Sequence, residues 1–379
     1  MKVNTIETIW KALNKIKIIV YIIVGFTLVC FSCALKKYSP AIYNVPSDTR
    51  SIQEAIERSH PGDTIIILPG IYILKEKNII IPDKSITIKG LEGAHKTIIK
   101  GRYGQPVVIF AQNSHAILRG VTITSEKQDK DQEPSLYGGG IVCDTDSAPT
   151  ISECIISGNN AIFGGGVYCS SSSHPRFIDC LISHNSAIEC GGGVCVFEAA
   201  VHITSSKIIH NRAESSGGGI FCYKDTSYVH NTLVTHNSTE FIAGGACCIE
   251  SAIKIINTTF ALNKSELSGG IYGLGGDIRL TNLIVWGNGE DLLLEDFSLD
   301  SRPRYSTIGD GGFSGINGNI SANPLFRDPN KEDFHLDPNS PCIDAGEPIE
   351  KFNDQDGSRN DMGAFGGPEA YTEPKERKF

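Results

Sequence analysis

Short apolar segments alternate with glycine-rich and asparagine-containing turns along the middle of the chain. Between Gly138 and Glu295 one unit recurs six times: a glycine run, a short apolar strand, a turn, a second apolar strand and an asparagine. Segments of Ile, Val and Thr bounded by Gly, Ser, Asn and Asp are typical of β-strands and turns. A Gly-Gly-Gly run inside a helix would cost roughly 1 kcal/mol per glycine, so the pattern predicts strands rather than helical repeats.

The asparagines recur at steps of 26, 26, 26, 26 and 25 residues. They are Asn159, Asn185, Asn211, Asn237, Asn263 and Asn288. A period of 20 to 50 residues indicates a solenoid, in which each coil buries its apolar side against its neighbours. We therefore predict an all-β, single-stranded parallel β-helix whose coils stack about 4.8 Å apart. Equivalent asparagines would form a buried ladder that bridges the coils and satisfies backbone groups of the turns.

The pattern divides the chain into five segments. They are residues 1–33, a secretion or lipoprotein signal; 34–50, a linker and cap entry; 51–136, an N-terminal cap and irregular coils; 137–296, regular coils of about 26 residues; and 297–379, an irregular C-terminal segment. Ser51 to Arg58 carries apolar residues at helical spacing, and Pro61-Gly62 ends the pattern. This predicts a short helix that caps the open end of the solenoid, where an uncovered strand edge could template aggregation.

The N-terminus predicts export. Ile18 to Phe31 is an apolar run after three lysines, too short to span a membrane comfortably and typical of a secretory signal. The sequence Val-Cys-Phe-Ser-Cys that ends at Cys33 resembles a bacterial lipobox, although Cys30 stands where leucine is usual. We expect lipidation of Cys33 and a location in the bacterial cell envelope or on the cell surface. Cleavage near Ala34 and an uncleaved anchor are the alternatives, and both also export the chain.

The charge of the chain argues against nucleic acid as a partner. Loss of residues 1–32 would remove four lysines and one glutamate and lower the formal net charge from −9 to −12. Phosphate contacts require Lys and Arg, so an acidic rod is a poor nucleic-acid binder. The expected partners are an extracellular polysaccharide or cell-surface partner, and the membrane through the lipid anchor; we expect a monomer.

Twelve cysteines in an exported protein would ordinarily indicate disulfides. Here the position three residues past the glycine runs is occupied in turn by Cys143, Cys169, Val196, Cys222 and Cys248. Stacked residues point in parallel at about 4.8 Å, whereas bridged Cβ atoms lie about 3.8 Å apart. The register therefore predicts buried free thiols that act as small apolar side chains.

Two stretches carry a resemblance to a known family. SIQEAIERSHPGDTIIILPGIY, from Ser51 to Tyr72, resembles the N-terminal coil of pectin-lyase-like right-handed β-helix proteins. Units such as GGGVYCSSSSHPRFIDCLISHNSA resemble their parallel β-helix repeats. The resemblance covers roughly residues 45–296 and implies a right-handed coil. It does not indicate an activity, because this fold hosts lyases, hydrolases, esterases, epimerases, adhesins and passive binders.

A further resemblance lies after the regular coils. Asn323 to Phe326, Asp333 to Leu336, Ser340 to Gly346 and Asp361 to Phe365 are similar to the C-terminal signature of bacterial surface β-helix proteins of the choice-of-anchor Q group. That resemblance implies attachment to a surface and fits a lipobox.

Candidate catalytic groups are few. Glu198, Lys224 and Glu250 occupy one position on consecutive coils, and coil spacing would place the two carboxylates about 9.6 Å apart, near the range of an inverting glycosidase. The alternative is a surface ladder of ion pairs worth under about 1 kcal/mol per pair. The motifs of polygalacturonases and pectinesterases are not found. Arg302-Pro303-Arg304 is suggestive of a pectate-lyase-like arginine base, but it follows the regular coils.

Period two along the strands predicts an outward row of aromatic side chains. Its members are Tyr168, Phe221, Tyr223 and Tyr272. Rings in a row on a flat sheet suit stacking against the sugars of a linear glycan. The alternative is that the C-terminal segment packs over them.

Two groups of residues, one of histidines and one of carboxylates, are candidate metal sites. His184, His210 and His236 would stand in a line, which suits no closed tetrahedral site, and Gly158 at the equivalent position indicates a tight turn. Acidic oxygens gather around a turn at Asp354, Asp356 and Asp361. The spacing excludes an EF-hand but leaves an irregular calcium site or a plain Asx turn. Calcium is the one cofactor candidate.

Taken with the export signal, the pattern favours a surface-anchored β-helix that binds or scaffolds an extracellular polysaccharide or surface partner. The alternative is a polysaccharide lyase or glycoside hydrolase on the same fold.

Overall fold

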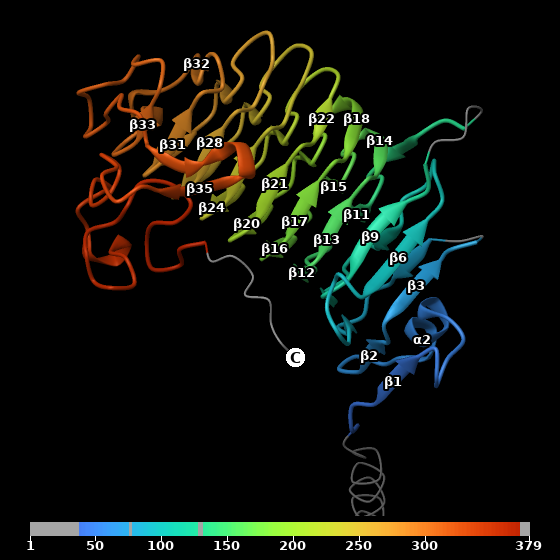
Figure 1. Cartoon of the computed structure of the whole chain (residues 1–379). Coiled ribbons are helices and arrows are strands. Elements are labelled where there is room, and N and C mark those ends of the chain that lie inside the picture. Colours follow the sequence, from blue (N-terminus) through green and yellow to red (C-terminus); the bar gives the residue numbers. More distant parts are fainter. Residues whose placement is uncertain (1–37, 76–77, 128–131, 372–379) are drawn as a thin grey trace, which may run out of the picture. The chain divides into compact units, whose positions relative to one another are not determined.

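The computed structural model describes residues 38–75, 78–127 and 132–371, and within them Ala41 onward forms one unit. This unit is a right-handed parallel β-helix, as the sequence predicts (Figure 1). The apolar run from Ile18 and the lipidation candidate Cys33 lie outside the described residues. Among the described residues, no helix is long and apolar enough to cross a membrane.

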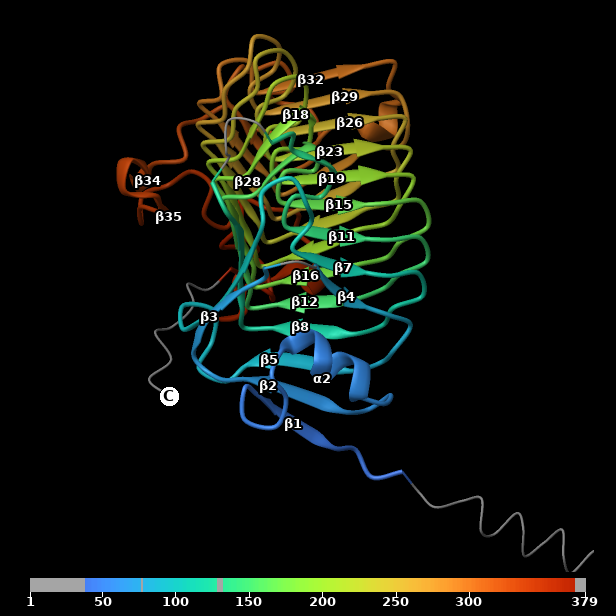
Figure 2. The same ribbon diagram turned by 90° about the vertical axis from the view of Figure 1, so that its right-hand side faces the viewer.

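Three long parallel sheets form the walls of the solenoid, and each coil contributes one strand to each sheet (Figure 2). Sheet A contains β1 (Ile42–Val45), β2 (Thr64–Ile67), β5 (Thr87–Gly90), β8 (Ile117–Arg119), β12 (Thr150–Ser152), β16 (Arg176–Ile178), β20 (His202–Thr204), β24 (Tyr228–His230), β27 (Lys254–Ile256) and β30 (Arg279–Thr281). Sheet B contains β3 (Gly70–Ile73), β6 (Thr97–Gly101), β9 (Thr122–Ser125), β13 (Ile155–Ser157), β17 (Leu181–Ser183), β21 (Lys207–Ile209), β25 (Leu233–Thr235), β28 (Thr259–Ala261), β31 (Ile284–Trp286) and β33 (Thr307–Ile308). Sheet C contains β4 (Ile79–Ile81), β7 (Val108–Phe110), β11 (Ile141–Cys143), β15 (Val167–Cys169), β19 (Val194–Phe197), β23 (Ile220–Tyr223), β26 (Ala246–Ile249), β29 (Ile271–Leu274) and β32 (Leu292–Glu295).

A fourth, shorter sheet D lies between sheets B and C in the regular coils. It contains β10 (Ser135–Tyr137), β14 (Asn160–Phe163), β18 (Ser186–Cys190) and β22 (Arg212–Ala213). Outside the four sheets the described elements are α2 (Ile52–Arg58), η1 (Leu299–Ser301), β34 (Phe326–Asp328), η2 (Pro329–Lys331), β35 (Asp333–Leu336) and η3 (Glu350–Phe352).

The core is a set of columns of like side chains, because the pairing register places equivalent residues of successive coils side by side. On sheet A the column runs through Ile151, Phe177 and Ile203, all fully buried. On sheet C, Cys143 pairs with Cys169 and Cys222 with Cys248. All four are buried free thiols, which confirms the interpretation of the cysteine register.

The glycine runs are required by the closeness of successive coils. The first glycine of each three-glycine run has a positive φ, for example +69° at Gly164 and +69° at Gly191, a conformation that suits glycine. The third leaves no room for a side chain, since a Cβ added to Gly166 would lie 2.6 Å from the carbonyl oxygen of Gly193. A glycine in each coil therefore lies against the glycine of the next.

The six asparagines form the ladder that their spacing predicts. The backbone N–H and the side-chain amide of Asn211 both donate to Oδ1 of Asn237, at 2.9 and 3.0 Å, and the amide also donates to the Ile182 carbonyl at 2.9 Å. The ladder ends on Asp291, whose Oδ1 accepts from the backbone and the amide of Asn288, each at 2.8 Å. Burial raises the pKa of Asp291, and these two hydrogen bonds oppose that rise.

The predicted capping helix is α2, and it covers the first coil (Figure 2). Ser51 is its N-cap and accepts from the backbone N–H of Glu54 at 3.1 Å. Its apolar side, Ile52, Ala55 and Ile56, is buried. At its C-terminal end Lys84 Nζ donates to the Ile56 carbonyl at 2.7 Å.

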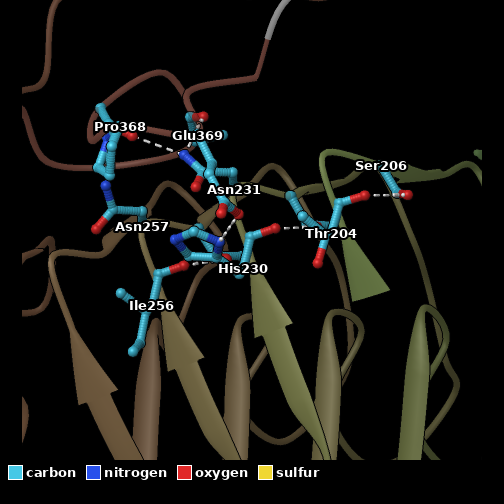
Figure 3. A network of polar contacts seen from close by, with 12 residues as sticks. Thr204, Ser206, His230, Asn231, Ile256, Asn257, Pro368 and Glu369 are labelled. Atoms are coloured by element: carbon cyan, nitrogen blue, oxygen red, sulfur yellow. Dashed lines mark hydrogen bonds and ion pairs between the residues drawn. The ribbon is translucent and has the colours of Figure 1, made fainter. Parts of the chain in front are cut away.

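The C-terminal segment packs against sheet B and against the corner between sheets A and B. Phe334 of β35 is buried in a cluster with Leu233 and Ala261 of sheet B. At the corner, the Asn231 amide donates to the carbonyl oxygens of Ala364 and Gly366, at 3.0 and 2.6 Å. The apolar cluster around the aromatic row contains no described residue of the C-terminal segment, so the expectation that this segment covers the row is wrong. Figure 3 shows Asn231 at the corner with Pro368 and Glu369 of the segment nearby.

Candidate functional site

The row predicted to bind a glycan is mostly buried. Phe221 is 7% exposed and Tyr272 is 6% exposed, while Tyr168 and Tyr223 are half-buried. They belong to an apolar cluster that includes Phe163 of β14, Cys190 of β18, and Ile242 from the segment that continues sheet D. The prediction of an open aromatic sheet face is therefore wrong for Phe221 and Tyr272.

Chain reversal at the glycine runs explains this burial. A Cβ added to Gly191 would lie 2.6 Å from Cβ of Cys195, and one added to Gly217 would lie 2.8 Å from Cβ of Phe221. The chain thus turns back directly over the outward side chains of sheet C. Period two correctly gives the direction of these side chains, but the loops of the same coils cover them.

Glu198, Lys224 and Glu250 lie at a turn that follows the strands of sheet C. All three have positive φ, between 49° and 52°. Lys224 Nζ lies 3.5 Å from Glu250 Oε2, and both side chains are largely exposed. Lys224 also lies over the Tyr223 ring, 4.9 Å from its centroid. This arrangement favours the surface ladder of ion pairs over an enclosed catalytic site.

The three histidines form a stack at the turn before the asparagine ladder. Ring centroids are 5.1 Å apart for His184 and His210 and 4.9 Å apart for His210 and His236. Their φ values lie between 54° and 57°, as expected for the tight-turn interpretation. His210 Nε2 lies 2.7 Å from Glu332 Oε1, and this bond lowers the pKa of Glu332.

The calcium candidates lie in the C-terminal segment and bind its backbone. Asp354 accepts from the N–H of Asp361 at 3.0 Å, Asp361 accepts from Asp344 at 2.7 Å, and Asp356 accepts from Ser358 at 2.9 Å. Burial, followed by the neighbouring carboxylates, raises the pKa of Asp361 to about 6. In the part of the chain that the structure describes, no group of three or more His, Cys, Asp or Glu could hold a metal ion.

A different row of side chains lies on the outer face of sheet A. One outward position on five consecutive strands is occupied by cationic and aromatic residues that pair in register. We call this the cationic row; its members are Arg176, His202, Tyr228, Lys254 and Arg279. All are exposed except Tyr228, which is half-buried and whose ring centroid lies 5.6 Å from that of His202.

The cationic row carries two arginines and one lysine, although the whole chain is acidic. Burial lowers the pKa of His202, and the charges of Arg176 and His174 lower it further. Among the described residues, Arg176 and Lys254 have no ion pair, whereas Arg279 Nε lies 2.9 Å from Asp277 Oδ1. Two cations of the row are therefore available to an anionic ligand.

At the C-terminal end of the row there is a pocket of about 260 Å³, which we call the arginine pocket. Its lining comprises Arg279, Leu280, Thr281, Leu299, Asp300, Arg302, Arg304, Asn317 and Glu347. Arg304 Nη2 lies 3.1 Å from Glu347 Oε1. Arg302 and Arg304, which the sequence offers as a candidate arginine base, line this pocket together with Arg279.

The C-terminal segment borders the cationic row along the corner with sheet B. His230, also on the outer face of sheet A, lies 3.4 Å from Glu369, as Figure 3 shows. Burial raises the pKa of Tyr228, and the charge of Glu369 raises it further. Arg176, His202 and Lys254 of the row remain exposed to solvent beside this segment.

The comparisons with known proteins agree with the fold. Residues 66–238 match the family model described as the right handed beta helix region. Among solved structures, the chain is similar to pectate lyase Pel9A, with 13% identity, a TM-score of 0.53, and coverage of 86% of this chain and 96% of that one. It also matches a pectin methylesterase from Aspergillus niger, with 11% identity, a TM-score of 0.38, and coverage of 76% and 92%. No curated protein sequence matches the chain.

Proposed function

From the right-handed parallel β-helix, we propose that the chain is an exported, envelope-anchored protein that binds a linear acidic polysaccharide along the cationic row. The observation that supports this most directly is the register of the row. Arg176, His202, Tyr228, Lys254 and Arg279 stand on five adjacent strands at one position. Their strands are spaced by about 4.8 Å, so the five side chains lie along a straight line.

The chemistry of the row suits carboxylate-bearing sugars. Arginine binds carboxylates through two parallel N–H donors, and lysine supplies a mobile point charge. Tyr228, between the cations, offers a ring face for the apolar side of a sugar. Each exposed charge contact contributes under about 1 kcal/mol, so useful affinity requires several contacts by one polymer. The regular row allows such multiple contacts.

Export and anchoring are part of the proposal and rest on the N-terminal sequence. Ile18 to Phe31 and the lipobox-like sequence ending at Cys33 support a lipoprotein on the cell envelope. The substitution Cys33→Ala should abolish labelling by a fatty-acid probe and release the protein from membranes. Labelling that survives the substitution would reject Cys33 as the lipid site.

Binding is tested by titrating the full chain with polygalacturonate and with a neutral glucan of equal length. We expect binding of the acidic polymer only, weakening as salt rises because the contacts are exposed charges. Arg176→Gln/Lys254→Gln should lower the affinity about tenfold or more. Lys264→Gln is the matched control, because Lys264 is exposed on the same coil as Lys254 but outside sheet A. Equal affinity in all three proteins would reject the proposal.

Incubation of the full chain with the same two polysaccharides tests the alternative, a polysaccharide lyase or glycoside hydrolase. The arginine pocket, where Asp300 and Glu347 lie among three arginines, is the place that favours it. A lyase would release unsaturated ends, and a hydrolase would release reducing ends. Binding without either product supports the binding protein.

A further inference from the structure

The two ends of the cationic row differ. Toward the N-terminus the outer face of sheet A continues through Thr150 and the exposed Ile117 on neighbouring strands. Toward the C-terminus, β30 is the last strand of sheet A, and η1 contacts it. Leu299 and Asp300 of η1 line the arginine pocket together with Arg279, the last member of the row. One end of the row is therefore an open sheet, whereas the other end is a pocket.

The size of the pocket sets the size of its ligand. A volume of about 260 Å³ lies just below the range of about 300–1,000 Å³ that encloses a drug-sized molecule. One sugar ring fits such a space better than several linked rings. The pocket is thus suited to a single residue of a polymer that lies along the row.

One of the three arginines that line the pocket is left without an ion pair in the part of the chain that the structure describes. Asp277 holds Arg279 and Glu347 holds Arg304, in ion pairs of 2.9 and 3.1 Å. Within the described ranges no hydrogen bond or ion pair engages the guanidinium of Arg302, which is half-buried. Arg302 is therefore the group available to a carboxylate.

The remaining polar groups suit the hydroxyls of a sugar. Glu347 is fixed in place, because its backbone N–H donates to Asn282 Oδ1 at 2.7 Å and its carboxylate contacts Arg304. Asp300 and Asn317 line the same space. Carboxylate oxygens accept from hydroxyl groups, and an amide can both donate and accept.

We infer that the arginine pocket binds the terminal anionic sugar of the polysaccharide, so that the protein recognises chain ends as well as chain interiors. Arg302 contacts the carboxylate of this terminal residue, and the cationic row holds the sugars that follow. This inference rests on the proposed binding of an acidic polysaccharide along sheet A.

The experiment compares binding of the ends of polysaccharide chains with binding of their interiors. The full chain is titrated calorimetrically with trigalacturonate, which is rich in ends, and with long polygalacturonate at equal sugar mass. We expect one trimer to bind per chain. Arg302→Gln should weaken trimer binding about tenfold and change polymer binding less than threefold. Arg176→Gln, remote from the pocket, should weaken polymer binding more than trimer binding.

Arg327→Gln is the matched control, because this substitution removes the same charge as Arg302→Gln. Arg327 is exposed on β34 and lies outside the lining of the pocket. Thermal unfolding of each variant shows whether it is folded. Polymer binding by the wild type with trimer binding unchanged in a folded Arg302→Gln overturns the chain-end inference and leaves the proposed function intact. Absence of polymer binding by the wild type rejects the proposed function itself.

Discussion

Sheets A and C are built from the same coils, yet the outward side chains in the middle of sheet C are buried, whereas those of the cationic row on sheet A are mostly exposed. On sheet C the outward residues Cys195, Phe221 and Cys247 are buried beneath loops of their own coils. On sheet A the outward residues Arg176, His202 and Lys254 are exposed to solvent. The difference lies in the connections: a glycine reversal precedes every regular strand of sheet C, whereas sheet A follows simple turns. Outward direction alone therefore does not make a binding surface.

The largest expected effect comes from disturbing the glycine reversal. Gly166→Ala would place a Cβ 2.6 Å from the Gly193 carbonyl oxygen and 2.9 Å from the Asn185 amide, so backbone and ladder must both shift. We expect a loss of stability at or above the top of the roughly 1–3 kcal/mol range for overpacking. The midpoint of urea unfolding measures it. Gly312→Ala is the control, because its nearest neighbour would be a side-chain oxygen at 3.6 Å.

The contrast between the two faces is tested by one substitution on each. Phe221→Ala removes a buried ring and should cost about 3 kcal/mol while leaving polysaccharide binding unchanged. Tyr228→Ala removes a half-buried ring of the cationic row and should weaken binding severalfold with a smaller loss of stability. Unfolding curves and titrations of both variants give the two readouts. Weaker binding by a folded Phe221→Ala would show that sheet C contributes to the site after all.

The asparagine ladder should show an intermediate effect. Asn211→Ala leaves the backbone N–H of Asn185 without its acceptor and removes two donors to the neighbouring coils. An unpaired buried polar group costs about 1–3 kcal/mol, which sets the expected loss of stability. Asn330→Ala, at an exposed position of η2, serves as the control for loss of an amide. An unchanged melting midpoint for Asn211→Ala would contradict a structural role for the ladder.

The sequence predicts those features that the repeat itself determines. Residues at one position of the 26-residue unit stack on one another, so the spacing of Asn159 and Asn185 is enough to predict the ladder, and that of Cys143 and Cys169 the thiol column. The cap at Asp291 could not be predicted in this way. It occurs once, where the repeat ends, and its carboxylate accepts from Asn288 in place of the asparagine of a further coil.

The candidate site was missed for a related reason. Arg176, His202 and Lys254 keep the same 26-residue steps, but the residue type changes from coil to coil, which hides the row from a search for like residues. The burial of Phe221 depends on a loop that folds over it from another part of the coil. The repeat period gives stacking and direction, whereas the exposure of a row is decided by the connecting loops and the C-terminal segment.

The smallest expected effect is a pH dependence of binding at His202. Burial and the charges of Arg176 and His174 hold the pKa of His202 below its usual value of 6.5, so the imidazole is neutral near pH 7. A bound polyanion favours the protonated imidazole, and proton uptake on binding makes the affinity rise as pH falls through the lowered pKa. The rise should stop near pH 4, where carboxyl groups of the polymer, with pKa values of about 3.5, begin to lose their charge.

Titrations with polygalacturonate between pH 7.5 and 4.5 measure this dependence of the affinity on pH. His202→Asn should flatten the rise, whereas His184→Asn, at the turn that follows β17, should leave it unchanged. An equal rise in the His202→Asn variant would place the titrating group outside the cationic row.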